Sequence, residues 1–121
     1  MEISVKGYNV HGRFGEYCLP VSVQNILHRG ACHENSWTFR LSVNEIFQDR
    51  SHVNLISLLN SSEIKQLDVI SVCSWSVINP NYSDQIFDLL ERNGVRFWSI
   101  FERCWVDRGL FASNQNYLKV I

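Results

Sequence analysis

The segment DVISVCSWSVI, residues 68–78, is an almost unbroken run of apolar and β-branched residues. A strand that is buried on both faces has this pattern, whereas a strand with one wet face alternates apolar and polar residues. The run therefore predicts a central strand in a sheet that is covered on both sides. Such a sheet needs helices elsewhere in the chain to form the covering layers.

Periodicity in the rest of the chain predicts these partners. Alternation or β-branched runs predict strands in five segments: 2–6, 37–43, 68–78, 95–106 and 116–121. In the second segment, one face would carry Trp37, Phe39, Leu41 and Val43. Helical spacing between end signals predicts helices at 20–30 and 83–94, each ending at a glycine. Shorter helical pieces are predicted at 44–49, capped by Asn44, and within 51–67.

Glycine-rich residues 7–17 predict a loop, and residues 107–115 predict a turn between the last two strands. The sequence therefore predicts the α+β class, with a single mixed sheet of about five strands and helices packed on it. With 121 residues and 45% hydrophobic content, residues 1–121 should form one domain.

Charge and apolar runs limit the classes of partner. The net charge is −1, and the 11 Lys and Arg residues are scattered rather than clustered. Direct nucleic-acid binding is therefore not expected. No run of 18 apolar residues predicts a membrane span, and the first residues do not have the pattern of a secretory signal. The four dispersed cysteines indicate a reducing compartment, so we expect the cytoplasm of a bacterial host cell.

Cys18 precedes the predicted helix by two residues. Free N–H groups at a helix N-terminus favour the thiolate form, as in papain-like hydrolases. Such an enzyme also needs a histidine base, and the candidates are His52 and His33 because the late strands contain none. The alternative is that Cys18 packs as a small hydrophobic residue. We therefore assign no catalytic residue with this motif and keep Cys18 with His52 or His33 as an alternative.

A zinc site is the next possibility, because His28 and Cys32 are four residues apart. Zinc requires four nitrogen or sulfur ligands in a tetrahedron. Gly30 would interrupt the helix that aligns these two residues, and the sequence has no Cys-x-x-Cys pair. No metal site is predicted.

Aromatic and arginine side chains are concentrated near the C-terminal end. Trp and Arg are enriched at the energetic centres of protein interfaces. The predicted binding surface consists of Arg96, Trp98, Arg103, Trp105 and Arg108. The alternative interpretation is that these aromatic residues only fill the two faces of a buried sheet.

The motif GRFGEYC, residues 12–18, resembles phage anti-CRISPR ADP-ribosyltransferases that modify a type I-F surveillance complex. The matching pieces are residues 1–3, 12–17, 38–47 and 83–121. The resemblance implies an NAD site at the loop 12–17, with Arg13, Glu16 and Tyr17 as its binding residues. The His-Thr element of that family is missing from the first strand, so the resemblance implies a protein that keeps the loop and acts by binding.

These observations together predict a small cytoplasmic inhibitor of anti-CRISPR or immunity type, encoded by a phage or mobile element. It would occlude a bacterial protein or ribonucleoprotein complex, without a cofactor. The alternatives are an ADP-ribosyltransferase-like enzyme that uses NAD and a Cys18-dependent hydrolase.

Overall fold

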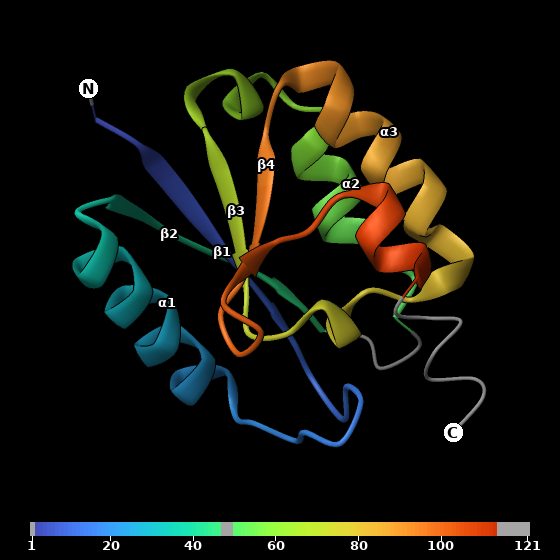
Figure 1. The fold of residues 1–121 in the computed structure, drawn as a ribbon, viewed down its shortest axis with the longest axis horizontal. Helices are drawn as coiled ribbons and strands as arrows, with labels where there is room; N and C mark the ends of the chain where they lie inside the picture. The colour runs from blue at the N-terminus through green and yellow to red at the C-terminus, as the bar shows by residue number, and fades with distance from the viewer. Residues whose placement is uncertain (1, 47–49, 114–121) are drawn as a thin grey trace.

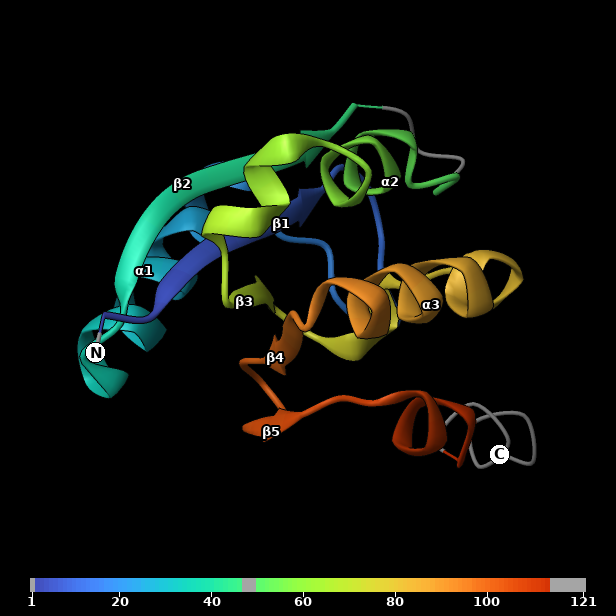
Figure 2. The same cartoon turned by 90° about the horizontal axis from the view of Figure 1, so that it is seen from above.

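The computed structural model describes residues 2–46 and 50–113 and contains one five-stranded sheet with helices on both faces (Figure 1, Figure 2). The strand order is β2-β1-β3-β4-β5, in which β5 is antiparallel and the other neighbours are parallel. The strands are β1 (Ser4–Val10), β2 (Thr38–Glu45), β3 (Val69–Val72), β4 (Arg96–Ser99) and β5 (Cys104–Trp105). The helices are α1 (Val21–Asn35), α2 (Val53–Leu59) and α3 (Ser83–Asn93), with 3-10 turns η1 (Ser62–Gln66), η2 (Trp75–Val77) and η3 (Pro80–Tyr82). The predicted α+β class and single mixed sheet are confirmed.

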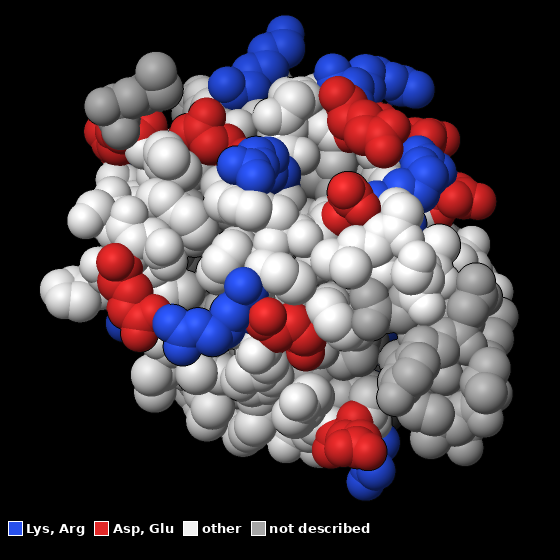
Figure 3. All heavy atoms as spheres, viewed as in Figure 1, with Lys and Arg blue, Asp and Glu red and all other residues white. Residues whose placement is uncertain are grey.

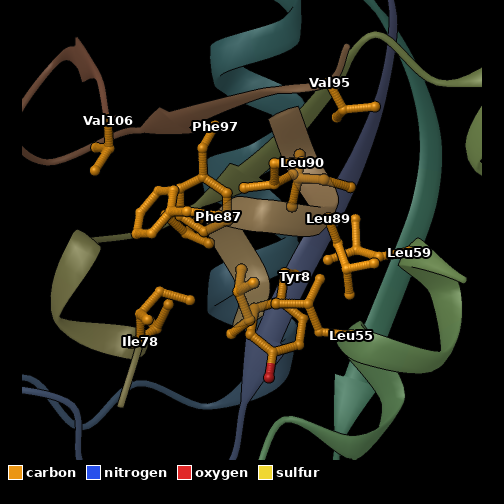
Figure 4. Close-up of a cluster of buried hydrophobic side chains, with 14 of the residues drawn as sticks. Tyr8, Leu55, Leu59, Ile78, Phe87, Leu89, Leu90, Val95, Phe97 and Val106 are labelled. Atoms are coloured by element: carbon orange, nitrogen blue, oxygen red, sulfur yellow. The ribbon is translucent and has the colours of Figure 1, made fainter. Parts of the chain in front are cut away.

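The central strands are buried on both faces, as predicted, but the strand predicted over residues 68–78 extends only over Val69–Val72, and residues 75–77 of the same run form the 3-10 turn η2. Tyr8 of β1 and Ile70 of β3 lie in the large core with α2 and α3, whereas Val5 and Val69 pack with Cys32 of α1. Helix α1 thus covers one face of the sheet, and α2 and α3 cover the other (Figure 2). Figure 4 shows the larger cluster around Phe87 and Phe97.

Strand β1 is longer than predicted, because residues 7–10 are strand rather than loop. Gly7 is required for close approach between layers and not for a turn. A Cβ atom on Gly7 would lie 2.5 Å from Ser42 Oγ and 2.6 Å from His28 Cδ2. The glycine-rich composition of this region was therefore a misleading turn signal.

Helix α1 continues past Gly30, where the sequence predicted its end, and stops at Asn35. A Cβ atom on Gly30 would meet nothing within 4 Å, so this glycine lies on the open side of the helix. Ser36 takes the left-handed conformation instead, with φ 58°. The Trp37 N–H then donates a hydrogen bond to the Cys32 carbonyl, and the chain turns back toward the sheet. By contrast, Gly94 ends α3 as predicted, with φ 65°.

A β-bulge interrupts the alternation predicted for residues 37–43. Val5 pairs with Phe39 and Gly7 with Ser42, so two residues of β2 lie opposite Lys6. Leu41 has φ 69° and is 69% exposed, so it does not lie on the buried face with Phe39. Strand β2 also continues through Asn44, which was predicted to cap a helical turn.

The C-terminal region differs most from the expectation. Residues 95–106 form two short strands, β4 and β5, around a turn at 100–103. Residues 108–113 are helical where a turn was predicted, because Asp107 Oδ1 accepts the Leu110 N–H at 2.8 Å and so caps the segment. The strand predicted at 116–121 lies outside the described residues.

Candidate functional site at the carboxyl edge of the sheet

The carboxyl ends of the parallel strands β1, β3 and β4 meet at one edge of the sheet (Figure 1). Three connections leave this edge: the loop 11–17, the loop 73–79 and the turn 100–103. Open parallel sheets bind ligands at this edge, because the strand ends leave a crevice between neighbouring connections. The candidate site is therefore built from these three segments.

The centre of this edge is the carboxylate of Glu102. Its Oε1 accepts the Trp75 N–H at 3.0 Å, and its Oε2 accepts the Ser74 hydroxyl at 3.0 Å. The Ser99 hydroxyl also donates to Oε1. Ser74 and Ser99 are 1% and 0% exposed, whereas Glu102 is half-buried. We call these three donors (Ser74 Oγ, Ser99 Oγ and the Trp75 N–H) the hydroxyl pocket.

The loop 11–17 packs against the loop after β3. Gly15 has φ +60°, and a Cβ atom there would lie 2.9 Å from Ser76 Oγ. The Ser76 hydroxyl in turn donates to Ser74 Oγ at 2.9 Å. The Tyr17 ring lies 4.7 Å from that of Phe101 in the turn. These contacts tie the three connections into one surface.

A buried chain of hydrogen bonds runs from β1 to the segment before η3. The Asn79 N–H donates to His52 Nε2 at 2.9 Å, and His52 Nδ1 lies 2.6 Å from the Tyr8 hydroxyl. A backbone N–H can only donate, so in the neutral ring the proton is on Nδ1 and is donated to Tyr8. Burial raises the pKa of Tyr8, and the charge of Glu45 and a hydrogen bond to it act in the same direction. Tyr8 is therefore a neutral phenol at physiological pH.

Arg50 is the cation that contacts the loop after β3. Its Nη2 donates to the Ser76 carbonyl. Burial lowers its pKa from the usual arginine value, and Tyr8 acts in the opposite direction. In the described part of the chain, its buried Nε has no hydrogen-bond partner. Among the described residues, no Lys or Arg side chain hydrogen-bonds to the hydroxyls of Ser74, Ser76 or Ser99.

The structure does not bring the alternative catalytic residues together. Cys18 is exposed before α1, and neither His52 nor His33 forms a hydrogen bond with it. His33 lies about 18 Å along the helix from its first residue. His52 is 0% exposed and is engaged with Tyr8 and Asn79. His28, considered as a zinc ligand, has its ring nitrogens bonded to Asn9 and Ser71.

The predicted tryptophan and arginine surface is largely occupied by contacts within the chain. The Arg96 guanidinium lies 3.6 Å from the centre of the Trp105 ring, and the Trp98 and Trp105 rings are 4.9 Å apart. Both tryptophans are half-buried. Phe97 and Trp98 do point to opposite faces, as their alternation predicted, since only Phe97 belongs to the large core. The alternative interpretation, that these aromatics fill the faces of the sheet, therefore accounts for much of this cluster.

The predicted arginines have different surroundings. Arg108 pairs with three carboxylates of α3: Asp84, Asp88 and Glu91. Arg103 is exposed and lies 3.8 Å from Glu34. Arg13 and Glu16 are exposed in the loop 11–17, and Tyr17 is 38% exposed.

The sequence analysis missed the hydroxyl pocket. Ser74 directly follows the predicted central strand, and this position at a strand end was the available signal. Glu102 falls within the continuous strand predicted at 95–106. Its partners are hydroxyls 28 and 3 residues away in the chain, which no local pattern links.

The surface carries both signs of charge. On the face shown in Figure 3, Lys and Arg side chains alternate with Asp and Glu rather than forming a basic patch. No helix in residues 2–46 and 50–113 is long and apolar enough to cross a membrane. The same residues contain no cluster of three or more His, Cys, Asp or Glu side chains that could hold a metal ion.

No protein-family model matches the sequence, and no curated protein matches it. Solved structures share the fold. The N-terminal catalytic domain of TP901-1 integrase matches with a TM-score of 0.66 and 14% identity, over 97% of this chain and 92% of that one. A resolvase family site-specific recombinase from Streptococcus pneumoniae matches with a TM-score of 0.68 and 11% identity, over 98% and 87%. The C-terminal catalytic domain of ISC1926 TnpA, an IS607-like serine recombinase, matches with a TM-score of 0.62 and 12% identity, over 93% and 77%.

These comparisons contradict the resemblance to anti-CRISPR ADP-ribosyltransferases. These three structural neighbours are an integrase catalytic domain, a site-specific recombinase and a serine recombinase catalytic domain, and each match covers more than nine-tenths of this chain. The inhibitor and immunity functions predicted from the sequence are therefore wrong, as is the ADP-ribosyltransferase alternative. The expectation of a protein partner without nucleic acid is contradicted for the same reason. Within the loop 12–17, Phe14 has a packing role, since it is fully buried in the large core.

Proposed function

We propose that this chain is a recombinase-fold domain that takes part in DNA recombination. The observation that carries this proposal is the extent of the likeness to the catalytic domain of TP901-1 integrase, which covers 97% of this chain and 92% of that one. A match over nearly the whole of both chains favours a shared role of the whole domain over a shared substructure. Such a role would place the protein with the DNA, in keeping with the bacterial cytoplasm expected from the sequence. No cofactor is part of the proposal.

Within recombination, the carboxyl edge supports a role other than cutting the strand. Cleavage of a phosphodiester by a serine needs a free hydroxyl and cations to stabilise the charge that develops on the phosphoryl group. Here the Ser74 and Ser99 hydroxyls donate to the carboxylate of Glu102, whose charge would repel a phosphate. We therefore propose an accessory domain in a recombination complex.

Strand cleavage by Ser76 is the second candidate. Ser76 is half-buried at the same edge, its hydroxyl donates to the Ser74 hydroxyl rather than to a carboxylate, and the Arg50 guanidinium binds its carbonyl oxygen. An arginine at this loop could pair with a phosphate oxygen. This observation justifies testing Ser76 as a nucleophile.

The test separates DNA association from covalent attachment. The tagged chain is expressed in the cell that carries its gene, where any partner recombinase is present, because a net charge of −1 predicts weak DNA binding by the chain alone. After formaldehyde crosslinking, we expect the captured DNA to be enriched at discrete loci. Without crosslinking, capture under denaturing conditions should recover no DNA.

The outcomes discriminate the two roles. DNA recovered without crosslinking, and lost in Ser76→Ala but not in the exposed control Ser57→Ala, would establish the second candidate. Absence of enriched loci after crosslinking would contradict a role in recombination.

A further inference from the structure

We propose that the hydroxyl pocket is an oxyanion site that Glu102 fills, and that a phosphate group replaces the Glu102 carboxylate when this side chain turns away. The inference rests on the proposed function only in taking DNA as the source of the phosphate. The pocket itself is inferred from the contacts of Ser74, Trp75, Ser99 and Glu102.

The pocket holds an anion with donors from three positions. Both oxygens of Glu102 are engaged, one by Ser74 and the other by Trp75 and Ser99. A carboxylate and a phosphate both present closely spaced, negatively charged oxygens to such donors, so the same donor set suits either group. Among these groups, only Glu102 carries a full charge. The contact therefore resembles an anion bound by a neutral pocket that comes from other segments of the chain.

Glu102 can leave without unfolding the sheet. The neighbouring bonds that hold the turn are main-chain bonds, from the Ile100 N–H to the Val72 carbonyl at 2.9 Å and from the Phe101 N–H to the Cys73 carbonyl at 2.8 Å. They do not depend on the Glu102 side chain. Because Glu102 is half-buried above two fully buried hydroxyls, a change of its rotamer would open the pocket to solvent.

Arg50 favours phosphate as the occupant. It binds the carbonyl of Ser76, two residues from Ser74, and its Nε has no partner among the described residues. A cation with an unused N–H donor thus lies at the same loop. Phosphate carries more negative charge than a carboxylate, so a cation at this loop favours phosphate through charge.

The test removes the internal anion and supplies inorganic phosphate. In Glu102→Ala, 100 mM phosphate should raise the Tm by roughly 5 °C relative to chloride at equal ionic strength, the shift expected for a dissociation constant of about 10 mM. The wild type should shift by less than about 1 °C over the same range, because its pocket is filled. The control Glu91→Ala, which removes an exposed carboxylate from α3, should behave as the wild type. Equal shifts in all three proteins, or none in Glu102→Ala, would overturn the proposal.

Further variants exclude a general effect of the substitution. Ser99→Ala combined with Glu102→Ala should lose the phosphate response, because one of the three donors is gone. Glu102→Gln, which retains an acceptor oxygen, serves if Glu102→Ala does not fold. If neither variant folds, the Glu102 carboxylate is required for folding, and its displacement by phosphate is excluded.

Two further results separate this inference from the proposed function. A single-stranded dinucleotide should reproduce the shift if the pocket takes a DNA phosphodiester, whereas a response to inorganic phosphate alone would overturn DNA as the source. A phosphate response in Glu102→Ala without enriched DNA loci would retain the pocket and reject the recombination role. Enriched DNA loci without a phosphate response would retain the recombination role and reject the phosphate pocket.

Discussion

Replacement of His28 by Ala is expected to lower the free energy of unfolding by about 3 kcal/mol. The substitution creates a buried cavity and leaves two polar groups without their hydrogen-bond partner. His28 is 0% exposed and lies between α1 and the sheet. Its Nε2 lies 2.8 Å from Asn9 Oδ1, and its Nδ1 lies 2.9 Å from the Ser71 hydroxyl. Asn9 Nδ2 already donates to Asn25 and Asn44, so Asn9 Oδ1 is the acceptor and the His28 proton is on Nε2.

Chemical denaturation of His28→Ala and of a matched control measures this effect. His33 belongs to the same helix and is exposed, so His33→Ala should change the free energy of unfolding by less than about 0.5 kcal/mol. Equal effects of the two substitutions would contradict the importance of the buried network.

The same residue should make stability depend on pH. Burial lowers the pKa of His28 to about 4, against an ordinary value of 6.5, although a hydrogen bond to the Tyr8 backbone acts in the opposite direction. Between these two values the unfolded chain binds a proton that the folded chain excludes, so stability falls as the pH decreases from 6.5 to 4. The total loss attributable to this group is about 3 kcal/mol.

The variant His28→Gln separates titration from packing. Its amide can donate to Asn9 and accept from Ser71 but does not titrate. We expect the wild type to lose about 3 kcal/mol more than His28→Gln as the pH is lowered through this range. Parallel pH profiles for the two proteins would refute the assignment.

The fold class and the central strand could be predicted because both follow from the pattern of apolar residues over long segments of the chain. Residues 69–72 are buried on both faces, and their part of the apolar run predicts a central strand without reference to its neighbours, whereas residues 75–77 of the same run form a 3-10 turn. Gly94 ends α3 through a purely local left-handed turn. The end of α1 could not be predicted in this way. Gly30 is compatible with a helical conformation, so α1 continues through it. The helix ends before Ser36 because the chain must turn there to bring Trp37 back to the sheet.

The candidate site could be predicted less well, since its contacts join distant segments. Ser74 and Glu102 meet only because β3 and β4 are neighbours, and that pairing is not encoded near either residue. The loop 12–17 had the opposite problem, because a short local motif suggested a nucleotide site. In the structure, Phe14 fills the core and Gly15 allows contact with Ser76, so packing alone accounts for these two residues.

Gly7→Ala is expected to destabilise the fold by about 2–3 kcal/mol, although the substitution adds one methyl group. The new Cβ would lie 2.5 Å from Ser42 Oγ and 2.6 Å from His28 Cδ2. The Ser42 hydroxyl donates to Asn25, and the His28 ring is fixed because Nε2 donates to Asn9 and Nδ1 accepts from Ser71. Neither neighbour can move without breaking the network between α1 and the sheet.

Gly30→Ala is the matched control, since it makes the same chemical change in α1. A Cβ at Gly30 meets nothing within 4 Å, and Ala favours a helix by about 1 kcal/mol over Gly, so this variant should be more stable than the wild type. Thermal unfolding should therefore show Tm changes of opposite sign for the two variants. A Gly7→Ala protein as stable as the wild type would mean that α1 can shift away from β1. In that event the effect predicted for His28→Ala should also be small, because both predictions depend on the rigid contact between this helix and the sheet.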